Sequence, residues 1–176
     1  MRTRTSFGLA IAAGLMAGAG AMLAAQGGMS GMGRGGMMKP DPAHQADMTL
    51  FHELLDQRAH ITRTVTPRPD GVESLTESDD PAIAAKIRAH VDSMSARVKE
   101  ARPIHQRDPL FQEVFKHADK IVMRAESTPK GVKVVETSSD AYVVKLIQAH
   151  AEVVSAFIAN GHVEMMKNHP VPERGK

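Results

Sequence analysis

Apolar and polar residues follow the same order twice along this chain. Residues 50–102 read as an apolar helical stripe, two short β-rich runs and a longer helical stripe, and residues 110–162 repeat that order. The β-rich runs are 61–66 with 72–76 and 121–126 with 132–137, and a Pro-x-Gly turn separates the two runs of each pair. The pattern predicts a helix, a β-hairpin and a second helix in each stretch.

The two stretches also match residue by residue at a constant offset. When residues 50–102 are laid on residues 110–162 without a gap, 14 of 53 positions are identical. The identical pairs include Gly71/Gly131, Ser78/Ser138 and His90/His150. We interpret the sequence as a tandem duplication of an α-β-β-α unit, with repeats at about 49–102 and 109–162.

One such unit has too little core to stand alone, because an isolated hairpin is marginally stable and its helices need a second surface. We therefore expect a single α+β domain over residues 42–176, ending in a short C-terminal tail. Its predicted form is a four-stranded, mainly antiparallel sheet with the long helices packed on one face. A homodimer could extend that sheet, although the sequence does not require one.

The N-terminal residues 1–25 have the pattern of a secretory signal peptide. Arg2 and Arg4 precede a long apolar run without charge, and cleavage is possible after Ala21 or after Ala25. A retained anchor is the alternative, but the run is rich in Gly and Ala and weakly apolar. We expect a periplasmic or secreted protein with no stable membrane insertion after cleavage, preceded by a flexible Gly/Met-rich linker at 26–41.

Composition excludes several classes of function. The 22 basic residues fall to 20 once Arg2 and Arg4 are removed, which equals the 20 acidic residues. No Lys/Arg cluster remains, so nucleic acid is not an expected partner. The chain has no Cys, which excludes disulfides, thiolate metal ligands and covalent haem attachment. No catalytic motif is present, so we do not expect an enzyme.

The repeated histidine is the strongest candidate for chemistry. His90 and His150 lie on the apolar face of their long helices, and a two-fold arrangement of the repeats could bring both imidazoles to one point. Paired neutral imidazoles suit a transition metal or a haem iron. The alternative is a pair of core histidines that hydrogen-bond neighbouring hydroxyls such as Ser95 and Ser155.

Two further segments have ligands that suit copper. The linker offers thioethers, a weak signal that also fits a plain spacer, at Met29, Met32, Met37 and Met38. After the last long helix, four residues at i, i+3, i+4 and i+7 share one helical face and could bind copper or simply pack as a hydrophobic edge: His162, Met165, Met166 and His169. His105 and His117 lack a repeated partner and are expected at the surface.

These patterns predict an exported small ligand-binding protein that binds copper or haem through His90 and His150 and exchanges it with a donor or acceptor. The alternative is a metal-free envelope module that acts through a sheet edge or a homodimer face. Glu53 and Glu113 also recur, but they lie away from the apolar stripe, which favours a solvated flank or an ion pair.

Overall fold

The computed structural model describes residues 42–175. The predicted signal peptide at 1–25 and the linker at 26–41 lie outside the described residues. The same holds for the four linker methionines Met29, Met32, Met37 and Met38. Their proposed copper chemistry therefore stays a prediction.

The element order is nearly the same in the two halves. The first half holds α1 (Pro42–Asp56), the 3-10 turn η1 (Arg58–His60), β1 (Thr62–Arg68), β2 (Gly71–Glu77) and α2 (Pro81–Lys99). The second holds α3 (Pro109–Lys116), η2 (Ala118–Lys120), β3 (Val122–Thr128), β4 (Gly131–Thr137), α4 (Ala141–Asn160) and the short α5 (His162–Met165). The strands of the second half begin and end 60 residues after those of the first. The duplication itself stays a prediction, because equal spacing does not establish a common origin.

Aspartate caps fix where three helices begin. The Asp80 and Asp140 side chains accept hydrogen bonds from the second and third backbone N–H groups of α2 and α4, and Asp108 accepts one from the second N–H group of α3. Pro81 and Pro109 follow two of these caps at the first helical position, where a missing N–H costs nothing. Local sequence chemistry therefore sets the start of each of these helices.

The four strands form one antiparallel sheet in the order β1-β2-β4-β3. The central pair joins the two halves, with Ser74 of β2 opposite its equivalent Val134 of β4. At each end of this pair a glycine lies against the other strand. A Cβ at Gly71 would lie 1.9 Å from the Glu136 carbonyl oxygen, and a Cβ at Gly131 would lie 2.1 Å from that of Thr76.

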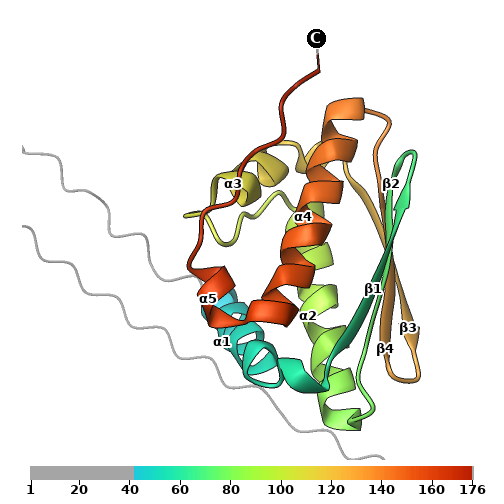
Figure 1. Ribbon diagram of the computed structural model, residues 1–176, viewed down its shortest axis with the longest axis vertical. Helices are drawn as coiled ribbons and strands as arrows, with labels where there is room; N and C mark the ends of the chain where they lie inside the picture. Colours follow the sequence, from blue (N-terminus) through green and yellow to red (C-terminus); the bar gives the residue numbers. More distant parts are fainter. Residues whose placement is uncertain (1–41, 176) are drawn as a thin grey trace, which may run out of the picture. The chain divides into compact units, whose positions relative to one another are not determined.

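The described helices all lie on one face of the sheet, as Figure 1 shows. The predicted α+β architecture, with its four-stranded antiparallel sheet and its long helices on one face, is confirmed. Two layers of helix are present: α2 and α4 contact the sheet, while α1 packs on α2 and α3 packs on α4.

Each long helix lies over the hairpin of the other half. α2 packs on β3 and β4, where Ile83 and Ile87 join Val132 and Val134 in one apolar cluster. α4 packs on β1 and β2, where Val143 and Ile147 surround Val72. Side chains at equivalent positions complete the crossing, since Arg88 donates to the Thr128 carbonyl and Gln148 to that of Arg68. The two halves therefore share one interlocked core.

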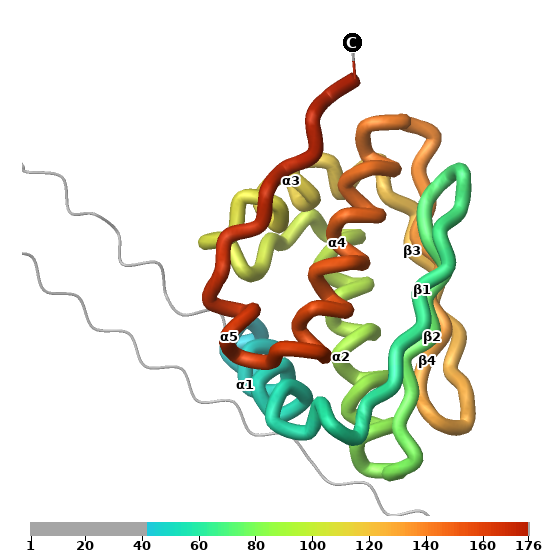
Figure 2. Tube along the Cα trace, in the orientation of Figure 1, coloured from blue at the N-terminus to red at the C-terminus, as the bar shows by residue number. Residues whose placement is uncertain are grey.

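The chain after α5 runs back along the helical side of the molecule (Figure 2). Arg107 binds the Met166 carbonyl, Lys145 binds that of Glu173, and Arg174 reaches Glu113. The predicted short C-terminal tail is thus attached to α3 and α4 at several points along its length.

Candidate functional site

A cavity of about 200 Å³ lies between the sheet and the two long helices. α2 and α4 pack on the sheet and on the outer helices rather than on each other, which leaves space between them. Apolar side chains make up most of its wall, among them Met48, Phe51, Ile87, Val91, Met94, Ile104, Phe111, Val154, Phe157 and Ile158. Concave, largely apolar sites of this kind are typical of small-molecule binding.

His90 of α2 lines this cavity. Its ring stacks on Phe51 at 5.8 Å between centroids, and its Nδ1 is buried without a hydrogen-bond partner among the described residues. Burial lowers the pKa of His90 to about 4, and the nearby Asp47 carboxylate opposes that change only in part. The imidazole is therefore neutral at pH 7.

His150 of α4 lines the same cavity, so the structure places the two repeated histidines around one space. Its ring meets Phe111 edge-on at 5.1 Å. Burial lowers the pKa of His150 to about 4; the Arg63 cation lowers it further, and Asp108 opposes the change. Both rings are half-buried. Both histidines line the cavity, and both rings are neutral at pH 7.

The sheet contributes a polar floor. Arg63 of β1 and Glu136 of β4 line the cavity beside Ser74 and Thr76. Arg63 Nη1 donates to Thr76 Oγ1 at 2.7 Å, whereas Arg63 Nε is buried and has no partner in the described part of the chain. Burial lowers the pKa of Arg63 and raises the pKa of Glu136, and each of these two charges opposes the change in the other.

Sequence reasoning missed these floor residues, although a signal was present. Strand alternation puts Glu136 on the same face as Val132 and Val134, and Arg63 on the same face as Val65. The sequence therefore contains one charged residue on the apolar face of each hairpin, Arg63 in the first and Glu136 in the second. His105 was missed as well: it is half-buried, contacts Phe111 at 4.8 Å and lines the cavity, so its expected surface position is wrong.

The C-terminal His/Met set is held by other contacts. The His169 ring binds Asp108 through Nδ1 at 2.5 Å and Glu164 through Nε2 at 3.1 Å. Burial disfavours the charged ring, but these two hydrogen bonds outweigh it and raise the pKa of His169. Both ring nitrogens are engaged by carboxylates, which attaches the tail to the N-terminus of α3.

The other members of that set do not join His169. His162 binds Asp56 at 2.9 Å and stacks on His52, Met165 packs on the core, and Met166 is 60% exposed. The helix ends at Met165, so the predicted shared face does not extend to His169. Copper binding by these four residues stays a prediction that would have to displace the contacts described.

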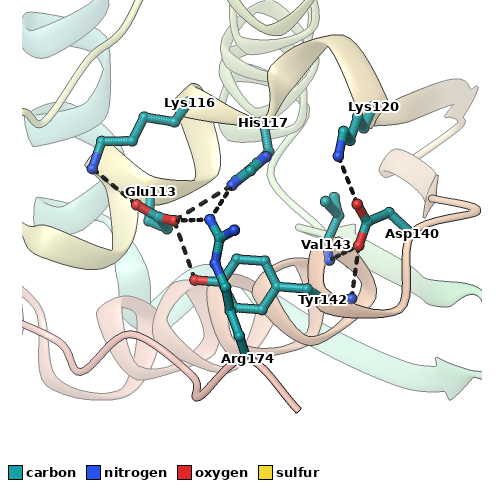
Figure 3. A network of polar contacts seen from close by, with 8 residues as sticks. All are labelled: Glu113, Lys116, His117, Lys120, Asp140, Tyr142, Val143 and Arg174. Carbon is teal, nitrogen blue, oxygen red and sulfur yellow. Dashed lines mark hydrogen bonds and ion pairs between the residues drawn. The ribbon is translucent and has the colours of Figure 1, made fainter. Parts of the chain in front are cut away.

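A second polar network lies at the C-terminal end of α3 (Figure 3). Lys116, then Arg174 and Tyr142, hydrogen-bond Glu113, and together they lower the pKa of Glu113 to about 2. The repeated Glu53 forms an ion pair with Lys86 at 3.0 Å. The expectation of ion pairs at these two glutamates agrees with the contacts. The network has its charges satisfied and shares no residue with the cavity wall.

Residues 42–175 contain no group of three or more His, Asp or Glu side chains arranged to hold a metal ion. A comparison of the sequence with protein-family models, with curated proteins and with solved structures found no significant match. The functional argument therefore rests on the geometry of the chain's own residues.

Proposed function

We propose that this protein binds a small amphipathic organic molecule in the cavity between α2, α4 and the sheet. The observation that supports this most directly is the combination of an apolar wall with unpartnered polar nitrogens, His90 Nδ1 and Arg63 Nε. Burying a hydrogen-bond donor or acceptor without a partner costs about 1–3 kcal/mol. A ligand that hydrogen-bonds these atoms would recover that cost.

The volume limits the size of the ligand. A cavity of about 150 Å³ lined by apolar side chains binds benzene, so a cavity of about 200 Å³ suits a molecule of roughly ten non-hydrogen atoms. The Phe157 ring contacts those of Phe51 and Phe111, and the three rings offer a surface for its apolar part.

A metal or haem held by His90 and His150 is the second candidate, because both neutral imidazoles line the same space. No third His, Asp or Glu side chain completes a metal site with them among residues 42–175. A haem needs only two axial ligands from the protein. However, the cavity is smaller than the roughly 300–1,000 Å³ usual for drug-sized ligands. Haem would therefore require α2 and α4 to move apart.

The test begins with protein purified from its native host. Extraction and mass spectrometry should identify a small organic molecule at near-stoichiometric amount, while a visible spectrum and elemental analysis detect haem or metal. A Soret band or bound copper that is lost in the His90→Ala variant would favour the second candidate.

A cavity-filling variant tests the location. Val154 lines the cavity, so Val154→Phe should remove the bound molecule, whereas Val163→Phe should not, because Val163 is 70% exposed. Equal ligand content in both variants would exclude this cavity. A native-host protein with neither organic ligand nor metal would instead favour the metal-free envelope module predicted as the alternative.

A further inference from the structure

The charged groups around the cavity do not balance. The lining includes two guanidinium groups, Arg58 and Arg63, and one carboxyl group, Glu136. The three histidines in the wall, His90, His105 and His150, have pKa values lowered by burial and add no positive charge at pH 7. The wall therefore has an excess of at least one positive charge. Burial raises the pKa of Glu136, which favours its neutral acid form and increases that excess.

Both arginines have unused hydrogen-bonding capacity. Arg63 Nε and Arg58 Nε are buried without a partner among residues 42–175. The planar guanidinium group suits a carboxylate, because Nε and a terminal nitrogen can donate to its two oxygens in parallel. Arg63 uses Nη1 for Thr76, and no hydrogen bond to Glu136 is formed in the described structure. Arg63 therefore lines the cavity with a guanidinium group whose hydrogen-bonding capacity is not fully used within residues 42–175.

The second half of the chain has no such anchor. Met123 stands at the position equivalent to Arg63, 60 residues later, and also lines the cavity. The polar end of the cavity is therefore defined by Arg63, while the two His-bearing helices and the phenylalanines form the rest of the wall. This asymmetry gives a bound molecule one orientation.

We propose that the ligand is an organic monocarboxylate, with its carboxylate bound by Arg63 and its hydrocarbon body between α2 and α4 against Phe51 and Phe157. This inference rests on the proposed ligand-binding function. One negative charge matches the excess in the wall, and the volume fits a fatty or aromatic acid of roughly ten non-hydrogen atoms.

The experiment compares two probes of equal chain length by isothermal titration calorimetry on the full mature chain. Octanoate has the carboxylate, and octan-1-ol has only the hydrocarbon body and a hydroxyl group. We expect octanoate to bind at least tenfold more tightly than octan-1-ol. In Arg63→Met this preference should disappear, with octanoate binding ten- to a hundredfold weaker and octan-1-ol unchanged, as expected for loss of a charged hydrogen bond.

Methionine is a matched replacement, because Met123 already occupies the equivalent position in this fold. Arg124→Met is the control: it removes the same charge from an exposed strand residue that does not line the cavity, and octanoate affinity should not change. If Arg63→Met fails to fold by circular dichroism, Arg58→Met, which alters a residue outside the strands, should reduce the preference for octanoate.

The outcomes separate this inference from the proposed function. If octanoate and octan-1-ol bind equally well, and neither arginine variant matters, the carboxylate inference is overturned while ligand binding stands. If neither probe binds and the native-host protein contains no organic molecule, both fail. Binding of octanoate that is abolished by Val154→Phe and weakened by Arg63→Met would support both.

Discussion

The two cavity histidines should make the stability of this protein fall as the pH drops from 7 to 5. Burial lowers the pKa of His90 and of His150 from 6.5 to about 4. As the pH falls below 6.5, the unfolded chain takes up a proton at each imidazole, while the folded chain does not until about pH 4. Stability is therefore lost through this window and changes no further for these groups below it.

The magnitude follows from the two pKa values. A tenfold change in proton affinity is about 1.4 kcal/mol, so each histidine could contribute roughly 3 kcal/mol in full and about 2 kcal/mol by pH 5. The pair should thus cost about 4 kcal/mol between pH 7 and pH 5, a large part of a typical folding free energy. Nearby Asp47 and Asp108 oppose the change in His90 and His150 respectively, and the pKa values of about 4 already include this opposition.

Other titrating groups also contribute. Burial lowers the pKa of His105 as well, so His105 adds to the loss of stability as the pH falls below 6.5. Lys116 and Lys120 are the main causes that lower the pKa of Glu113 and Asp140 to about 2, so their contribution is present above pH 4.5 and is lost only as the pH falls towards 2. The raised pKa of His169 acts in the opposite sense: its contribution is present below pH 6.5 and is lost as the pH rises.

Urea unfolding of ligand-free protein, followed by circular dichroism at pH 7, 6 and 5, measures the effect. The variant with His90→Gln and His150→Gln should lose about 4 kcal/mol less over this range than the unmodified chain. Replacing the exposed His44 and His60 by Gln should leave the loss unchanged. If the cavity variant and the unmodified chain lose the same free energy, the two imidazoles are not buried as neutral groups, and the reasoning is refuted.

Three further predictions concern the scaffold. Gly131→Ala should destabilise the protein by about 3 kcal/mol or more, because the added Cβ would lie 2.1 Å from the backbone oxygen of Thr76 in the central strand pair; an unfolding midpoint equal to that of the unmodified chain would contradict this. Asp47→Ala should cost about 3 kcal/mol, since it removes the carboxylate that pairs with the buried Arg97, and urea unfolding would show it. A fragment of residues 42–108 should lack cooperative unfolding in a thermal scan, because it lacks the β3–β4 hairpin on which α2 packs.

The fold could be predicted from the sequence because its signals are local. Apolar periodicity located the long helices, the Pro-x-Gly turns located the hairpins, and Asp80, Asp108 and Asp140 marked where helices begin. A single four-stranded sheet followed from the argument that two half-cores must share a surface, but the pairing of β2 with β4 was not predicted. What the pattern did not predict was the crossing of each long helix onto the other hairpin, since apolar residues on a helix do not specify which strand pair they will cover.

The candidate site was predicted in part. His90 and His150 could be placed around one space because they recur at equivalent helix positions. Arg63 and Glu136 do not recur: Met123 and Thr76 occupy the equivalent positions, so a search for repeated residues passes over them. Similarly, His169 suggested a metal ligand by its helical spacing, but the chain leaves the helix after Met165, and the ring meets Asp108 and Glu164 instead. Non-local contacts of this kind require coordinates.

The crossing of the helices also explains why the cavity exists. α2 and α4 each pack on the hairpin of the other half, and the central β2–β4 pair joins the two hairpins. Phe51 of α1 and Phe111 of α3 form the part of the cavity wall that comes from the outer layer of helices. Movement of either long helix would disturb the apolar cluster it shares with the other half. The folded core therefore holds an apolar cavity whose wall includes the polar groups His90, His150 and Arg63.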